Sequence, residues 1–180
     1  MARTVSGYSR TQIALHWAIA LLILLQFLGG DFVSEYYEKV VDSGAQQNAA
    51  PILAKAHVIL GIATVALMVL RLVVRLWQGV PDAPADEDPR LKLVAKLTHG
   101  LLYLALFLVP VSGLVGWFGA NTLAAFVHTT LTSVLLAFVG LHVAAALYHH
   151  FILKNNLLAR IVPEPVLRRI IPAKLQDTLR

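Results

Sequence analysis

The chain has 180 residues, of which 58% are hydrophobic and only 14% are charged, and its mean hydropathy is +0.71. Soluble domains contain about 25% charged residues, so these values argue against a water-soluble globule. The sequence contains no cysteine, which excludes disulfides, iron–sulfur clusters, thiolate-bound zinc and covalently attached c-type haem. The net charge of +5 could suggest a nucleic-acid partner, but its meaning depends on where the basic residues lie.

Four apolar runs are each long enough to cross a bilayer, which takes about 20 residues. The first run resembles a signal peptide, but no small-x-small cleavage pattern follows it and His16 lies inside it, so we interpret it as a retained span. We therefore predict an all-α integral membrane four-helix bundle in a single domain, residues 1–180. The expected spans are residues 13–29, 53–76, 93–118 and 123–153.

Basic residues determine the predicted orientation, because Lys and Arg accumulate in cytoplasmic loops. Thirteen of the fifteen precede the first run, surround the connection between the second and third, or follow the fourth. Only Lys39 and Lys55 fall on the other side. Both termini are therefore predicted to be cytoplasmic, with residues 154–180 as a basic cytoplasmic tail. The positive charge is thus a topology signal, and the argument for a nucleic-acid partner is lost.

Two connections have distinct compositions. Residues 30–51 form an outer loop whose aromatic and charged residues have the spacing of a short interfacial helix, after a first span that ends at Gly29-Gly30. The connection between the second and third spans carries three prolines among acidic residues, and we expect an irregular, solvated linker there. These acidic residues are Asp82, Asp86, Glu87 and Asp88.

All seven histidines lie in or at the ends of the apolar runs. They are His16, His57, His99, His128, His142, His149 and His150. Ionisable groups inside a membrane are costly, so each needs a partner. A single intramembrane histidine is most simply an interhelical hydrogen-bonding group. Hydrogen bonding between helices explains seven of them poorly, because almost no carboxylate lies beside them to act as a partner.

Helical rise assigns these histidines to levels. His142 lies fourteen residues after His128, on nearly the same helix face and about 21 Å further inward. His57 starts the second span on the outer side, level with His128. His16 lies twelve residues before Leu28, or about 18 Å from the outer end of its span, close to the level of His142.

A third level is predicted at the inner mouth of the bundle. His99 lies nineteen residues before Phe118, or about 28 Å inward, and His149 lies about 31 Å below His128. His99 and His149 are therefore expected to share one depth, with His150 beside them.

Two imidazoles that face each other from different helices are what bis-histidine haem ligation requires. Zinc takes three or four protein ligands, and no predicted level offers them. Gly61, one turn after His57, would let a flat macrocycle approach the helix, although small residues also serve ordinary helix packing. Arg71 lies about 21 Å inward of His57, either as a counter-ion to haem propionates or snorkelling to the inner interface. A proton relay in a transporter without haem is the alternative for the histidines.

Several segments resemble the bacterial cytochrome b561 family. They are Tyr8-Ser9-Arg10-x-Gln12-Ile13-Ala14-Leu15-His16-Trp17, Ala56-His57-x3-Gly61, Arg71 with Arg75, Pro110-Val111-x-Gly113, and His128-x13-His142 followed by His149-His150. The resemblance covers essentially residues 6–160. It implies a membrane cytochrome with two haem b groups, the outer one on His57 and His128 and the inner one on His16 and His142.

Members of this family divide into two groups. Stand-alone members are similar to superoxide oxidase, which takes electrons from superoxide at the outer face and reduces ubiquinone. Longer relatives are cytochrome subunits of hydrogenases and formate dehydrogenases. The short loops favour the first group, so the resemblance implies a superoxide:ubiquinone oxidoreductase, with an electron-transfer subunit of a larger complex as the alternative. The oligomeric state, a homo-oligomer included, stays open.

Two further expectations concern the substrates. At the inner mouth, His99, His149 and His150 could deliver protons to ubiquinone, because imidazole exchanges protons near neutral pH; interfacial hydrogen bonding is the alternative role. At the outer face, four acidic residues oppose two lysines, a net charge of −2 that would repel superoxide. These residues are Asp31, Glu35, Glu38 and Asp42 against Lys39 and Lys55, of which Lys55 lies two residues from His57 and offers a local positive charge.

Overall fold

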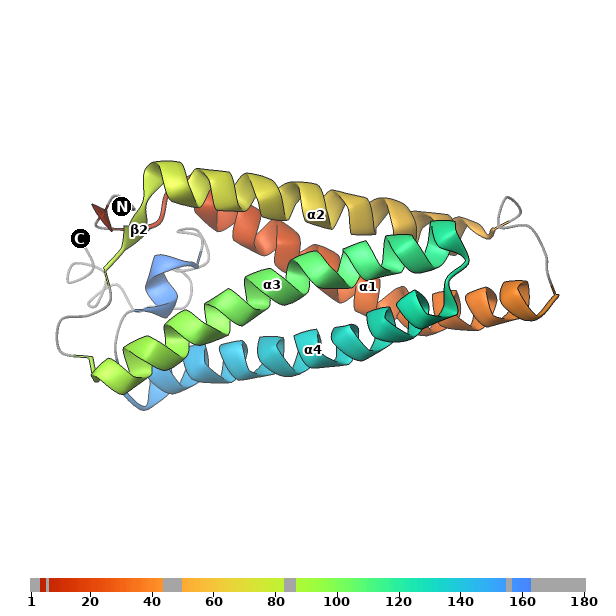
Figure 1. Cartoon of the computed structure of the whole chain (residues 1–180). Helices are drawn as coiled ribbons and strands as arrows, with labels where there is room; N and C mark the ends of the chain where they lie inside the picture. The colour runs from red at the N-terminus through yellow and green to blue at the C-terminus, as the bar shows by residue number, and fades with distance from the viewer. Residues whose placement is uncertain (1–3, 6, 44–49, 83–86, 155–156, 163–180) are drawn as a thin grey trace.

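The computed structural model describes residues 4–5, 7–43, 50–82, 87–154 and 157–162 (Figure 1). Its four long helices are α1 (Arg10–Ser43), α2 (Ile52–Gln78), α3 (Pro89–Gly119) and α4 (Thr122–Phe151). Two-residue strands β1 (Thr4–Val5) and β2 (Val80–Pro81) pair in parallel, and the 3-10 turn η2 (Leu158–Arg160) follows α4. The predicted all-α, four-helix architecture is confirmed.

The helices form an up-and-down bundle. In Figure 1, α2 and α4 lie on opposite sides, and α1 and α3 run obliquely between them. α1 packs along α2, α3 packs along α4, and α2 also contacts α3. The end at which α1 begins and α4 stops is called the basic end, because it carries Arg10, Arg75, Arg90 and Lys154. The opposite end holds the turn between α3 and α4.

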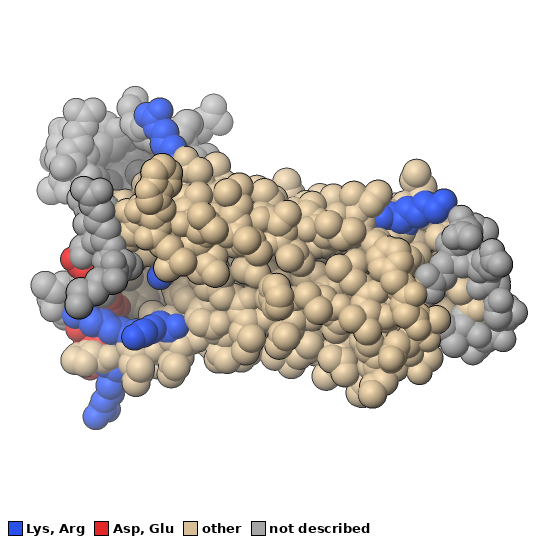
Figure 2. Space-filling model, turned by 45° about the horizontal axis from the view of Figure 1, so that its top comes forward, with Lys and Arg blue, Asp and Glu red and all other residues tan. Residues whose placement is uncertain are grey.

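The outside of the bundle is apolar between its two ends. Leu28, Leu76 and Phe118 are 71%, 64% and 70% exposed, and on the face drawn in Figure 2 charged side chains lie only toward the two ends. All four helices have the length and composition of membrane spans. Such an apolar surface is untenable in water and suits lipid. The protein is therefore a multi-pass membrane protein.

The first helix is longer than the sequence indicated. α1 passes through Gly29 and Gly30 without a break and ends at Ser43, so the expected separate interfacial helix is wrong. Each glycine costs about 1 kcal/mol relative to alanine in a helix interior, and contacts with α3 offset that cost. The Tyr37 hydroxyl donates to the Gly116 carbonyl at 3.1 Å. Tertiary packing therefore extends the helix beyond its local signals.

α3 and α4 form an antiparallel hairpin with a tight turn. Ala120 adopts the left-handed conformation with φ 45°, and the Asn121 side chain caps α4 by accepting from the Ala124 amide at 2.9 Å. A Cβ at Gly116 would lie 3.0 Å from the Ala125 nitrogen, so the two backbones approach closely here. As a result, residues equally far along the chain from this turn lie side by side.

The described part of the basic tail folds back onto the bundle. The Trp17 indole nitrogen donates to the Ile161 carbonyl at 2.8 Å, and the Arg160 guanidinium donates to the Asp82 carbonyl at 2.6 Å. The stretch around η2 thus contacts α1 and the chain that follows α2. The rest of the predicted tail, residues 155–156 and 163–180, lies outside the described residues.

The start of α1 has a capping box, and its glutamine also ties this start to the end of α2. The Ser9 amide donates to the Gln12 side-chain oxygen at 3.0 Å, and the Gln12 amide donates to the Ser9 hydroxyl at 3.1 Å. The Gln12 side-chain nitrogen also donates to the Gly79 carbonyl at 2.8 Å, and Gln12 as a residue is only 3% exposed. One buried amide therefore caps one helix and holds the next beside it.

We expect Gln12→Ala to lower the free energy of unfolding by about 1–3 kcal/mol, since it leaves the partly buried Ser9 amide and the buried Gly79 carbonyl without these partners. Thermal unfolding of the purified protein in detergent measures this as a lower Tm. Thr11→Ala, an exposed neighbour in the same turn, is the matched control. Equal Tm values for the two variants would contradict the capping role.

Candidate functional site

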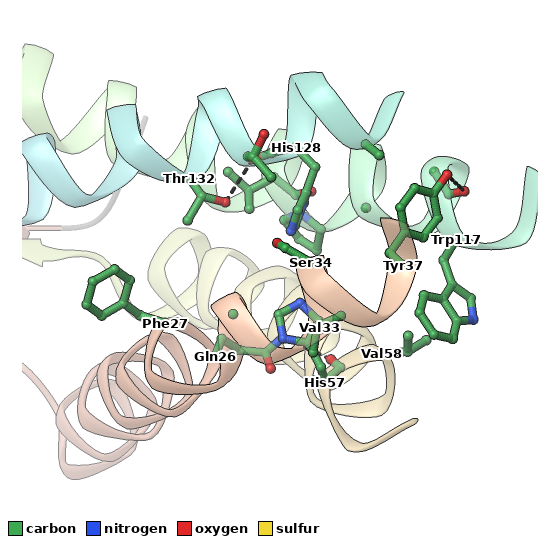
Figure 3. A pocket seen from close by; sticks show the side chains of 18 of the residues that line it. Gln26, Phe27, Val33, Ser34, Tyr37, His57, Val58, Trp117, His128 and Thr132 are labelled. Carbon is green, nitrogen blue, oxygen red and sulfur yellow. Dashed lines mark hydrogen bonds between the residues drawn. The ribbon is translucent and has the colours of Figure 1, made fainter. Parts of the chain in front are cut away.

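A cavity of about 790 Å³ opens inside the bundle, toward the end that holds the turn between α3 and α4. His57 of α2 and His128 of α4 line this cavity. Figure 3 shows the two rings pointing toward one another across it. Their centroids are 6.1 Å apart and their planes cross at 82°. The structure thus brings together the two histidines that the sequence placed at the outer level.

α3 fixes the ring state of His128. Its Nδ1 lies 2.7 Å from the Val109 carbonyl oxygen. A carbonyl can only accept a hydrogen bond, so Nδ1 carries a proton, and in the neutral ring Nε2 is then the nitrogen with the free lone pair. This is the arrangement in which a histidine is ready to bind a metal through Nε2.

His57 is held differently. The Gln26 side-chain nitrogen donates to the His57 backbone carbonyl at 2.9 Å, while the ring Nδ1 is buried and has no hydrogen-bond partner among the described residues. Gly61 lines the same cavity. A Cβ there would meet only the Gln26 nitrogen, at 3.4 Å, so the missing side chain leaves the cavity wall recessed beside the histidine.

A second pair lies nearer the basic end. The rings of His16 on α1 and His142 on α4 have centroids 6.3 Å apart and planes at 63°. Arg71 of α2 donates to the Gln12 carbonyl at 2.7 Å, and its charge acts electrostatically on both rings. The structure therefore also brings together His16 and His142, the pair that helical rise predicts at the inner level. Arg71 lies at the same level, as the sequence predicted.

His99 lies at a different level from the one predicted. Its ring centroid is 5.0 Å from that of His142, so His99 belongs to the inner pair's level and the predicted depth shared with His149 is wrong. The error came from counting inward from Phe118 on one helix and from His128 on the other. Counted from the turn between α3 and α4, His99 and His142 are equally distant, and the hairpin sets them side by side.

The remaining two histidines lie at the end of α4. His149 Nε2 is 3.3 Å from Glu87 Oε1, and the two side chains are only 12% and 8% exposed. The expected solvated linker is therefore wrong at Glu87, whose side chain is nearly buried. The His150 ring packs on Phe151 with centroids 4.8 Å apart. His149 and Glu87 form a buried carboxylate–imidazole pair at the basic end.

Both facing pairs have the dimensions of metal ligation by two opposed imidazoles. With metal–nitrogen bonds of about 2 Å, two such rings have centroids roughly 6 Å apart, close to the separations observed. No group of three His, Cys, Asp or Glu within the described ranges could hold a metal ion. Two donors per level in an apolar cavity, with a recessed wall at Gly61, fit haem better than a bare ion.

Sequence reasoning gave no role at these sites to three residues, although Gly113 belongs to one of the segments that resemble the family. Gly113 lies against the His128 ring, Gln26 holds His57 and Glu87 pairs with His149. Gly113 is as far from the hairpin turn as His128, so the register of the hairpin would have found it. Gln26 stands out as an amide in an apolar run. Glu87 gave no local signal that separated it from its solvated acidic neighbours.

Comparisons with known proteins agree with this geometry. The family model described as prokaryotic cytochrome b561 matches residues 7–164. Cytochrome b562 of Cereibacter sphaeroides is 35% identical over 161 residues, covering 87% of this chain and 95% of the relative. Probable superoxide oxidase CybB of Yersinia pestis is 27% identical over 179 residues, covering 87% and 96%. Cytochrome b561 homolog 1 of Escherichia coli is 23% identical over 180 residues, covering 88% and 98%. The chain therefore belongs to the prokaryotic cytochrome b561 family of haem b membrane proteins of electron transfer.

Proposed function

We propose that the chain holds two haem b groups, one between His57 and His128 and one between His16 and His142, and transfers electrons across the bilayer to ubiquinone. The observation that carries this proposal is the pair of facing imidazoles at each of two depths, 6.1 and 6.3 Å between centroids. When bound, haem supplies the one-electron oxidation and reduction that these side chains cannot perform.

The basic end is the cytoplasmic side in this proposal, because Lys and Arg accumulate there. The protein then lies in the bacterial inner membrane with both termini inside. His57 and His128 bind at the outer level, and His16 and His142 bind at the inner level. Arg71, which acts electrostatically on both inner rings, can also hold a propionate carboxylate at that level.

The basic end is also where ubiquinone takes its protons in this proposal. Reduction of ubiquinone to ubiquinol consumes two electrons and two protons, and the bilayer core holds no water to supply the protons. His149 and Glu87 lie within 3.3 Å of each other at this end, next to His150. The His99 ring is in contact with the His142 ring. These side chains can hold and pass protons between the cytoplasm and the quinone.

The outer electron donor is superoxide in the first form of this proposal, which makes the chain a superoxide:ubiquinone oxidoreductase. The relative with the name probable superoxide oxidase supports it. The outer charges oppose it, because Asp31 and Glu38 line the cavity and none of its described lining residues is Lys or Arg. Lys39 is paired with Glu35 at 2.6 Å, which leaves Lys55 as the nearby cation in the described loop ends.

The acidic residues that line the cavity favour a second candidate for the function of this chain. In it the chain is the cytochrome b subunit of a hydrogenase- or formate dehydrogenase-type complex and receives electrons from a protein partner. Carboxylates such as Asp31 and Glu38 slow the approach of a small anion but can complement a basic patch on a protein surface. Co-purification with such a partner, together with no reaction of the isolated chain with superoxide, would select this candidate.

The purified protein should show a Soret band and b-type α-bands with two haems per chain. We expect His128→Ala to remove one haem and leave the other, because the inner pair keeps both its ligands. Haem content by extraction and the reduced-minus-oxidised spectrum measure this. His150→Ala, which removes a ring from the same helix outside either pair, should keep both haems. Loss of neither haem in His128→Ala would refute the pairing.

The donor assignment can be tested through charge. If superoxide is the donor, the double variant Asp31→Asn, Glu38→Gln should oxidise it severalfold faster at low salt, because like-charge repulsion at the cavity is removed. The difference should shrink at high salt. Ubiquinone reduction driven by a superoxide source is the measurement, with the spontaneous reaction subtracted. A wild-type rate no faster than the spontaneous one would rule out superoxide.

Proton delivery can be tested at the buried His149–Glu87 pair. Glu87→Gln keeps the shape of the side chain but removes its proton-accepting carboxylate, so we expect ubiquinone reduction to slow about tenfold or more. Haem content and chemical reduction of the haems should stay as in the wild type. Asp82→Asn, on the same connection and exposed, is the control. An unchanged rate in Glu87→Gln would remove this pair from the proton route.

A further inference from the structure

α3 contributes no ligand to the proposed haem sites, yet it contacts the ring of His128 in two ways. The Val109 carbonyl oxygen accepts from His128 Nδ1 at 2.7 Å. Gly113, one turn later on the same helix, lies directly against the ring. Val109 and Gly113 line the same cavity as the His128 ring, so α3 contacts the histidine at the wall of the proposed haem site.

Gly113 has to lack a side chain for the ring to lie where it does. A Cβ at this position would be 2.8 Å from His128 Nδ1 and 2.9 Å from its Cε1, closer than Cβ atoms ordinarily approach other atoms. The residue sits inside the regular α3 helix, so backbone conformation does not call for a glycine. By contrast, a Cβ at Gly100 or Gly140 would meet nothing within 4 Å.

The Val109 contact has a chemical consequence for the ring. A carbonyl that accepts the Nδ1 proton makes the opposite nitrogen, Nε2, more basic. A more basic ligand stabilises the oxidised, more positive iron, and so lowers the reduction potential. The partner histidine, His57, has no such bond, because its Nδ1 has no hydrogen-bond partner among the described residues. Tuning through hydrogen bonding therefore falls on the α4 ligand.

The same carbonyl serves a second donor. The Ser112 hydroxyl donates to Val109 O at 2.8 Å. Two donors on one acceptor share its electron density, so Ser112 weakens the bond that His128 makes. The strength of the His128 bond thus depends on a neighbour that does not touch the ring in any described contact.

We propose that α3 positions the outer α4 ligand: Gly113 provides the space in which the His128 ring lies, and the Val109 carbonyl fixes its tautomer and lowers the reduction potential of the outer haem. Gly113 and Val109 are positioning residues that act through His128. The inference rests on the proposed binding of haem between His57 and His128.

The test is a redox titration of the full-length purified protein with both haems bound. In Gly113→Ala the ring must move off Val109, so the potential of one haem should rise while that of the other stays at its wild-type value. The haem concerned is the one that His128→Ala loses. Gly140→Ala, on α4 with open space around it, should leave both potentials unchanged.

Gly116→Ala separates ring positioning from simple loosening of the hairpin. Its Cβ would press on the Ala125 backbone at 3.0 Å and push α3 from α4 without touching His128. Ser112→Ala is a milder variant that preserves the packing, and it should shift the same haem in the opposite direction, to a lower potential. Electron paramagnetic resonance of the wild type adds a check that needs no variant, since ring planes crossed at 82° should give one strongly anisotropic low-spin ferric signal.

The outcomes are distinct. A rise confined to the outer haem in Gly113→Ala, or loss of that haem alone, supports the inference when Ser112→Ala shifts it downward. Unchanged potentials in both variants would overturn it, as would an equal shift of both haems in Gly113→Ala, the result expected when Gly116→Ala loosens the whole hairpin. Absence of haem from the wild-type protein, or retention of both haems in His128→Ala, would instead overturn the proposed function.

Discussion

The close approach of α3 and α4 at Gly116 and Ala125 is the constraint on which the arrangement of the sites depends. It fixes the register of an antiparallel hairpin, and that register sets Gly113 beside His128 and His99 beside His142. α4 supplies one imidazole to each facing pair. A slip of one helical turn would therefore move both levels at once, which couples the geometry of two sites about 21 Å apart along α4.

Polar contacts between helices add to a small apolar core inside the bundle. Few hydrophobic side chains are buried within the described residues, because lipid covers the outer face and a cavity occupies part of the centre. Single polar groups then align neighbouring helices: Gln12 and Gln26 join α1 to α2, and Tyr37 joins α1 to α3. In the absence of competing water, such bonds specify which helix faces meet.

The two ends of the molecule differ in charge in a way that matches their proposed tasks. The basic end combines Arg71, which acts on the inner histidine pair, with the covered His149–Glu87 pair that could exchange protons with the cytoplasm. The opposite end presents Asp31 and Glu38 at the cavity. An electron acceptor that needs protons suits the first environment, and a neutral or basic donor suits the second.

Composition, apolar run length and charge distribution determined the four spans and the predicted orientation, and helical rise alone placed His57 with His128 and His16 with His142. These quantities depend on each helix by itself, so a sequence contains them. Tertiary structure decided what depends on two helices at once: the continuation of α1 past Gly29 and Gly30, the burial of Glu87, the contact of His99 with His142 and the fit of Gly113 against His128. Such contacts are set by helix register and tilt, which follow from close packing between residues that local patterns treat as unrelated.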